Sequence, residues 1–187
     1  MASKAEGLYR AYLGSRFGMS RDGVLDEYEA LSPDPNDERR WRDELISEQL
    51  RAACEGDTDA LSGLTILGAV HELPELARLA SERDGFYRVR VAETIWYMID
   101  KLDVSGVAPP VQRAALDAAT AAAQDVARGH FASPPDDQVE WLLRQGADVR
   151  EALARRASGR LAEYGRLSVQ TRSPLERAPL PGSTTAP

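Results

Sequence analysis

The sequence predicts an all-α fold built as an irregular stack of antiparallel helix hairpins, either a fragment of an α-solenoid or a compact helical domain. Apolar residues recur at three- and four-residue spacings along most of the chain, and glycine or proline interrupts these stretches at intervals typical of helices. The 187 residues are close to one ordinary domain and can bury roughly 70% of their unfolded surface. We therefore expect one helical domain over residues 1–167 and a disordered, proline-rich tail over residues 168–187.

The most apolar and best-patterned part of the chain is interpreted as a helix hairpin with arms at residues 63–81 and 86–102. One broad arc of the second arm is apolar and contains Tyr87, Val89, Val91, Ala92, Ile95, Trp96, Met98, Ile99 and Leu102. The opposite arc contains Arg90, Glu93, Tyr97, Asp100 and Lys101. We expect this helix to be buried on most sides, with Arg88 as a charged exception inside the apolar arc.

Three shorter helices are predicted before this hairpin. The first covers residues 3–17 and is closed by Gly18, with an apolar face of Leu8, Tyr9, Tyr12, Leu13 and Phe17. The second covers residues 20–31 and ends at two prolines. The third begins at Asn36 or Asp37, where acidic residues favour a helix N-terminus, and it ends near Cys54. It turns Trp41 and Leu45 inward.

The C-terminal half predicts three further helices. Residues 110–127 form an alanine-rich helix, whose small side chains permit close approach of its neighbours. Gly129 ends it, and a second helix follows over residues 133–146. The last predicted helix covers residues 148–164, where Arg150 heads an apolar stripe that includes Leu153, Ala157 and Leu161.

Charge is distributed unevenly along the chain, whose formal net charge is −7. Residues 20–60 hold thirteen acidic side chains against five arginines, whereas residues 144–177 hold eight arginines against four acids. The acidic stretch is either the solvated outer face of surface helices or a docking surface for a basic protein. Nucleic acid is not expected as a partner, because its phosphates require a basic face.

Residue types that commonly carry catalysis or bind metals are scarce. Cys54 is the only cysteine, and His71 and His130 are the only histidines. Neither histidine lies in a metal-ligand spacing, and no nucleophile elbow or glycine-rich phosphate loop accompanies them. Acidic residues near positions 26–29 and 43–48 are expected to be solvated rather than to hold a cation. We therefore expect no enzymatic activity, no cofactor and no metal.

The sequence also predicts a cytoplasmic location and no membrane contact. Residues 1–17 lack the long apolar run of a signal peptide, and no stretch approaches the roughly 18 apolar residues of a membrane span. Lysine occurs only at Lys4 and Lys101 while alanine is very frequent, which is typical of a GC-rich, bacterial coding sequence.

Two helices share a pattern that resembles the HEAT repeat family. Each has an aspartate upstream of an apolar residue and an arginine, as in Asp84 with Arg88 and Asp148 with Arg150, followed by small and aliphatic residues. The resemblance covers residues 60–102 and 136–165. It implies an irregular HEAT-like stack, because the arginines are farther apart than the roughly 40 to 47 residues of a regular repeat. It also implies an inter-repeat polar ladder made by these four side chains.

A second, rival resemblance is to ankyrin repeats. Residues 139–149 read VEWLLRQGADV, which is similar to the Leu-Leu-x-x-Gly-Ala-Asp-Val end of an ankyrin unit, although no complete 33-residue unit is present. We favour the HEAT-like interpretation. Both families imply paired antiparallel helices that offer an extended binding face.

The leading functional hypothesis is a protein-interaction module, such as an adaptor, an inhibitor or an immunity-type protein, that docks a basic protein partner. The candidate binding residues flank the turn at Pro33 and Pro35 or lie on the polar arc of the central helix; they are Asp26, Glu27, Glu29, Asp37, Glu38 and Tyr97. The alternative is a small-ligand or peptide sensor with a pocket between hairpins, lined by Trp41, Trp96, Tyr12 and Phe86. The sequence leaves the partner's identity and the oligomeric state open.

Overall fold

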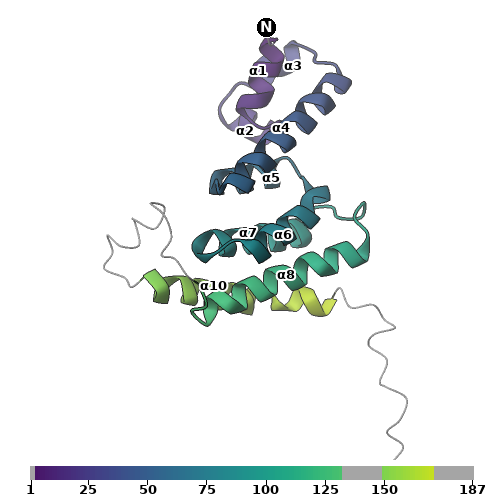
Figure 1. Ribbon diagram of the computed structural model, residues 1–187. Coiled ribbons are helices and arrows are strands. Elements are labelled where there is room, and N and C mark those ends of the chain that lie inside the picture. Colours follow the sequence, from purple (N-terminus) through teal and green to yellow (C-terminus); the bar gives the residue numbers. More distant parts are fainter. Residues whose placement is uncertain (1–2, 132–148, 171–187) are drawn as a thin grey trace, which may run out of the picture.

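The computed structural model describes residues 3–131 and 149–170, and every regular element within these ranges is a helix (Figure 1). This confirms the predicted all-α fold. The helices are α1 (Lys4–Ala11), α2 (Arg16–Arg21), α3 (Leu25–Ala30), α4 (Pro35–Glu55), α5 (Thr58–Ile66), a short 3₁₀ helix η1 (Val70–Glu72), α6 (Leu73–Glu82), α7 (Gly85–Lys101), α8 (Pro109–Ala127) and α10 (Val149–Gln170).

The first three helices and the N-terminal half of α4 form a small lobe, seen at the top of Figure 1 and called here the N-terminal lobe. Its core is made by Ala5, Tyr9, Met19, Tyr28, Trp41 and Leu45, together with Leu67 from the end of α5. The Tyr9 ring lies 5.6 Å from Trp41 and 6.4 Å from Tyr28, centroid to centroid. Aromatic side chains therefore fill much of a core that short helices could not otherwise close.

The remaining helices, α5 to α10, form a larger unit called here the body. Among the residues that the structure describes, its core holds 26 buried ones, ten of them alanines, including Ala53 from the end of α4. Helix α8 packs against α6, α7 and α10 (Figure 1), and the alanines on its inner side, such as Ala119 and Ala122, are fully buried. Small side chains let neighbouring helices approach closely, which confirms the packing role predicted for the alanine-rich helix.

The predicted helix over residues 3–17 is wrong, because the chain folds into two helices there. Helix α1 ends at Ala11, and Leu13 and Gly14 adopt left-handed conformations with φ of 51° and 68°. The Ser15 hydroxyl then accepts a hydrogen bond from the Gly18 amide at 3.1 Å and caps α2. Gly18 therefore lies inside a helix instead of ending one, and Phe17 is 80% exposed.

Other helix boundaries also differ from the sequence prediction. Residues 63–81 do not form one helix, because Gly68, with φ of 62°, separates α5 from η1 and α6. The helix predicted from residue 20 begins only at Leu25. The predicted cap of α4 at Asn36 or Asp37 is wrong, because the Asp34 side chain caps the helix by accepting from the Asn36 amide. The other end is close to its predicted limit, since α4 ends at Glu55 and Gly56, with φ of 104°, follows it.

The sequence predicts Arg88 and Arg150 within apolar stripes. In the structure these two side chains have different environments. The Arg88 side chain is 15% exposed, donates from Nε to the Ala80 carbonyl at 2.7 Å and pairs with Asp125 on α8 at 3.1 Å. Arg88 thus links α6, α7 and α8, as a framework residue would. The burial predicted for Arg150 is wrong, because this residue is exposed and its guanidinium lies over the Phe131 ring, 5.0 Å from the centroid.

Several predictions lie partly or wholly outside the residues that the structure describes. These include Asp148, the helix at 133–146, the stretch 139–148 that resembles an ankyrin repeat, and tail residues 171–187. Helix α10 continues to Gln170, past the predicted end at Tyr164. Among the described helices, none combines the length and the apolar character needed to span a bilayer.

Candidate functional site

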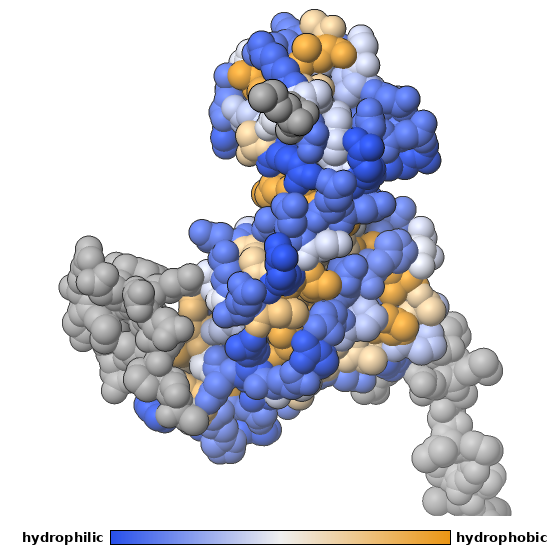
Figure 2. Space-filling model, turned by 45° about the horizontal axis from the view of Figure 1, so that its top comes forward, coloured by the Kyte–Doolittle hydropathy of each residue, from blue (hydrophilic) through white to orange (hydrophobic). Residues whose placement is uncertain are grey.

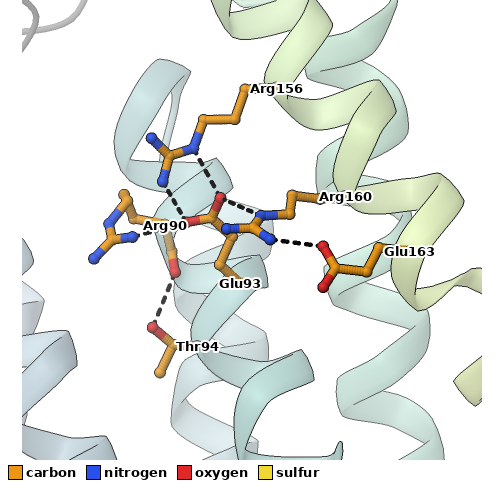
Figure 3. Close-up of polar contacts among 6 residues, drawn as sticks. All are labelled: Arg90, Glu93, Thr94, Arg156, Arg160 and Glu163. Carbon is orange, nitrogen blue, oxygen red and sulfur yellow. Dashed lines mark hydrogen bonds and ion pairs between the residues drawn. The ribbon is translucent and has the colours of Figure 1, made fainter.

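A densely connected polar site surrounds Glu93, at the middle of α7 (Figure 3). Arg156 on α10 donates to both carboxylate oxygens, from Nε at 2.8 Å and from Nη2 at 2.7 Å. Arg160 donates from Nε at 3.1 Å, and Arg90 donates from Nη1 at 2.8 Å. These four residues are called here the Glu93 cluster. It joins α10 to α7 through one carboxylate and two guanidinium groups from the other helix.

The environment keeps Glu93 ionised although the residue is only 8% exposed. Burial alone raises the pKa of this carboxyl, but hydrogen bonds from Arg156 and Arg160 and the charge of Arg90 outweigh burial and hold the pKa below its ordinary value. Charge-assisted bonds of this kind, one of them bidentate, are the strong class of hydrogen bond. The Glu93 cluster is therefore a charged network at the junction of two helices.

A pocket opens beside the Glu93 cluster, between α5, α7 and α10. It has a volume of about 180 Å³, and its lining includes Arg90, Glu93 and Arg160 from the cluster together with Ser62, Thr65, Thr94, Tyr97 and Tyr164. The Tyr164 ring is stacked on Trp96, with centroids 5.3 Å apart and planes at 11°. The pocket thus combines positive charge, hydroxyl groups and one fixed aromatic wall.

Tyr97 is the only one of the six predicted binding residues that lines this pocket. It is 44% exposed, so its predicted exposure is confirmed. The other five lie in the N-terminal lobe, on α3 and at the start of α4, while α7 lies in the body (Figure 1). The six residues therefore belong to two separate surfaces.

The five predicted acidic residues Asp26, Glu27, Glu29, Asp37 and Glu38 are called here the acidic face. Four of them pair with cations of the same lobe: Lys4 with Glu27, Arg16 with Glu29 at 3.0 Å and Glu38 at 3.4 Å, and Arg40 with Asp37 at 2.9 Å. Glu38 also accepts a hydrogen bond from the Tyr28 hydroxyl. Four of the five carboxylates are thus in local ion pairs, and they share three cations.

The four aromatic side chains that the sequence predicts around a ligand pocket do not lie together in one pocket of the described residues. Trp41 and Tyr12 belong to the N-terminal lobe's core, whereas Trp96 and Phe86 belong to the body's core. Phe86 lies beneath the Arg156 guanidinium, 5.4 Å from it. The four side chains therefore contribute to two different cores.

Groups that could bind a metal or act as a nucleophile are scarce among the residues described by the structure. No group of three or more His, Cys, Asp or Glu side chains within those residues could hold a metal ion. The pKa of the Cys54 thiol is raised, by burial first and by its hydrogen bond to Glu75 second. A raised pKa disfavours the thiolate, so Cys54 is a poor nucleophile.

Sequence reasoning missed the Glu93 cluster. The helical pattern places Glu93 on the polar, outer arc of its helix. It places Arg156 and Arg160 only within a basic stretch. The available signal was their spacing of four, which places both arginines on one face of α10. The sequence does not show that this face of α10 contacts Glu93, which lies 63 residues before Arg156.

Comparison with known proteins gives no further assignment: no protein-family model, curated protein or solved structure matches the chain.

Proposed function

We propose that this chain is a non-enzymatic, cytoplasmic protein-interaction module, such as an adaptor, an inhibitor or an immunity-type protein, and that it docks a basic protein through its N-terminal lobe. The acidic face supplies the charge. Complementary charge chiefly speeds encounter and orients the partners, while affinity comes from apolar anchors. The proposal therefore needs an exposed apolar side chain next to the acidic face.

Phe17 is the observation that carries the proposal. It is 80% exposed at the start of α2, although an aromatic side chain of this size would normally be buried in so small a lobe. Its chain neighbour Arg16 pairs with Glu29 and Glu38, so the first turn of α2, which carries Phe17, is linked to two members of the acidic face. Leu31, 40% exposed, follows α3 two residues after Glu29.

The surface of the N-terminal lobe has both hydrophilic and apolar areas, as docking surfaces commonly do. Figure 2 shows apolar patches interrupting the largely hydrophilic surface of the upper, N-terminal lobe. Aromatic residues are enriched at the centres of interfaces, with charged groups at the rim. The local ion pairs do not prevent docking, because exposed pairs contribute only about 0 to 1 kcal/mol and exchange partners readily.

The test begins with capture of a partner from an extract of the source organism, followed by purification of that partner. Association and dissociation rates are then measured at low and high salt. The triple reversal Asp26→Lys, Glu27→Lys and Glu29→Lys should slow association roughly tenfold at low salt and flatten the salt dependence. Phe17→Ser should instead speed dissociation.

A matched control places the same number of reversals on the body. Glu82, Asp117 and Glu151 are exposed there, and their reversal to lysine should leave both rates close to those of the wild-type chain. Far-UV circular dichroism checks that each variant is folded. The proposal is wrong if the acidic-face reversal binds at the wild-type rate with the wild-type salt response, or if only the control set slows binding.

A further inference from the structure

The pocket beside the Glu93 cluster has an excess of positive charge. Arg90, Arg156 and Arg160 surround Glu93, and Arg160 also pairs with Glu163 at 2.6 Å. Three guanidinium groups thus face two carboxylates, which leaves one positive charge without a counterion in the cluster. Part of that charge is shielded from water, since the side chains of Arg90 and Arg156 are 28% and 31% exposed.

Two of these arginines line the pocket and keep donors for a ligand. Within the described ranges, Arg90 uses only Nη1, for Glu93, and Arg160 uses Nε for Glu93 and Nη1 for Glu163. A guanidinium carries five N–H donors in a planar fork. Nitrogen donors of both side chains therefore remain for an acceptor in the pocket.

Hydroxyl groups line the same pocket. Ser62 and Thr65 come from α5, and Tyr97 from α7. Thr65 donates to the Ser62 carbonyl at 2.7 Å, whereas the Ser62 and Tyr97 hydroxyls have no hydrogen-bond partner among the residues described. Two guanidinium groups and two free hydroxyls therefore converge on a hollow of about 180 Å³, which can hold several water molecules or one small anion.

We propose that this pocket binds a phosphate group, either free phosphate or the phosphate of a small phosphorylated molecule, between Arg90 and Arg160. A phosphate group matches the planar donor fork of arginine bidentately and has further oxygens for the Ser62 and Tyr97 hydroxyls. It also supplies the missing negative charge. The Glu93 carboxylate also lines the pocket and repels an anion, but the three arginines bonded to it offset its charge.

This site is independent of the docking function proposed for the N-terminal lobe. Its pocket is built by α5, α7 and α10, and the acidic face by α3 and α4. The plain alternative is that the arginines only join α10 to α7. In that case the excess charge is balanced by solvent ions, and no particular anion is preferred.

Isothermal titration calorimetry on the full chain separates these cases. The titrants are inorganic phosphate and phenyl phosphate, each compared with sodium chloride at equal ionic strength. We expect saturable binding with one site per chain, at concentrations up to about 10 mM, which covers a millimolar Kd. Tighter binding of phenyl phosphate would indicate a phosphorylated molecule whose remainder contacts Tyr97 or Tyr164, and equal binding would indicate free phosphate.

Three variants locate the site. Arg90→Gln removes one pocket donor while Arg156 and Arg160 still hold Glu93, and it should weaken binding roughly tenfold. Tyr97→Phe removes one hydroxyl and should weaken it about threefold. Arg155→Gln is the matched control on α10, since Arg155 is exposed and lies outside this pocket, and it should bind like the wild-type chain.

Three results would overturn the proposal. The first is the absence of saturable heat with either phosphate compound. The second is an unchanged affinity in both Arg90→Gln and Tyr97→Phe. The third is a loss of binding in Arg155→Gln alone, which would place the anion in the neighbouring hollow lined by Arg155, Arg156 and Glu163. Circular dichroism and thermal melting accompany each titration, and a folded Tyr97→Phe keeps the test decisive if Arg90→Gln is unstable.

Discussion

The N-terminal lobe and the body fill their helical cores with different kinds of side chain. The lobe packs helices of six to eight residues and half of α4 around seven buried residues, three of them the aromatic side chains Tyr9, Tyr28 and Trp41. The body packs longer helices around 26 buried residues, ten of them alanines. A small core buries less apolar surface, so the lobe has less to offset its conformational entropy.

The two regions also place their ion pairs differently. In the lobe, the side chains of Arg16 and Glu29 are 56% and 52% exposed, and those of the more buried pair Arg10 and Glu6 are still 27% and 20% exposed. In the body, Glu93 is 9% exposed as a side chain and Arg88 is 15% exposed. Exposed pairs contribute little, whereas the loss of one partner from a buried pair is costly. The comparison predicts that equivalent substitutions have unequal effects in the two regions.

The largest effect is expected for Glu93→Ala. This substitution leaves three guanidinium groups near one another with no central carboxylate, and it should lower the free energy of unfolding by about 3 kcal/mol, the lower end for a broken buried pair. Urea denaturation followed by circular dichroism measures this. A loss below about 1 kcal/mol would place the Glu93 cluster in the same class as the exposed pairs of the lobe.

Arg88→Ala should have the next largest effect. It removes a bond to the Ala80 carbonyl and a pair with Asp125, and we expect a loss of roughly 2 kcal/mol. Arg150→Ala is the matched control, because Arg150 is exposed and its recorded ring contact with Phe131 contributes about 0.5 to 1 kcal/mol at such a site. Equal shifts in the two melting curves would contradict the assignment of Arg88 as a framework residue.

The pH dependence of the free energy of unfolding should isolate the contribution of Glu93. Its folded pKa is lowered, so its contribution is present above the unfolded value of about 4.3 and is lost as pH falls through the folded pKa. The stability difference between the wild-type chain and Glu93→Gln should therefore shrink as pH falls below about 4.3. Asp22, Glu75 and Asp103 also have lowered pKa values, but their contributions cancel in this difference. A difference that stays constant to pH 3 would show that Glu93 does not titrate as described.

The smallest effect is expected for Glu29→Gln. It removes the partner of Arg16 at the surface of the lobe, and the free energy of unfolding should change by less than about 1 kcal/mol. Thermal melting at low and high salt checks this, since any effect should fade as salt screens the pair. A loss comparable to that of Arg88→Ala would mean that the lobe depends on its ion pairs.

The sequence predicted the fold class. It also predicted those helices in which the apolar periodicity agrees with the residues that end a helix. The long helix α4, with Gly56 after it, and the alanine-rich α8 were both predictable because periodicity and helix-ending residues are local signals, although the cap of α4 is Asp34 and not the predicted Asn36 or Asp37. The break after α1 was not. Residues 3–17 keep a helical apolar spacing, and the turn at Leu13 requires a left-handed backbone that leucine rarely adopts.

The site was harder to predict than the fold. Glu93 lies on the polar arc of α7, and its burial depends on α10 covering that arc, which no local pattern records. Arg150 was misplaced for the converse reason: it lies in line with Leu153 and Ala157 on the helical wheel, yet the buried surface begins only at Leu153. Periodicity identifies a face of a helix but does not show where along the helix a neighbour begins.

Native-state hydrogen exchange on the full chain tests the central claim most directly, namely that the chain holds two cores of unequal stability. Amides in the middle of α1 and α3 should exchange through openings at least about 2 kcal/mol less costly than those in α7 and α8. Increasing urea should expose the body's amides only near global unfolding. The low-stability region would then be the one that carries Phe17 and the acidic face. If amides of α1, α3, α7 and α8 instead exchange with one common free energy and one urea dependence, the chain unfolds as a single unit and the distinction between lobe and body is wrong.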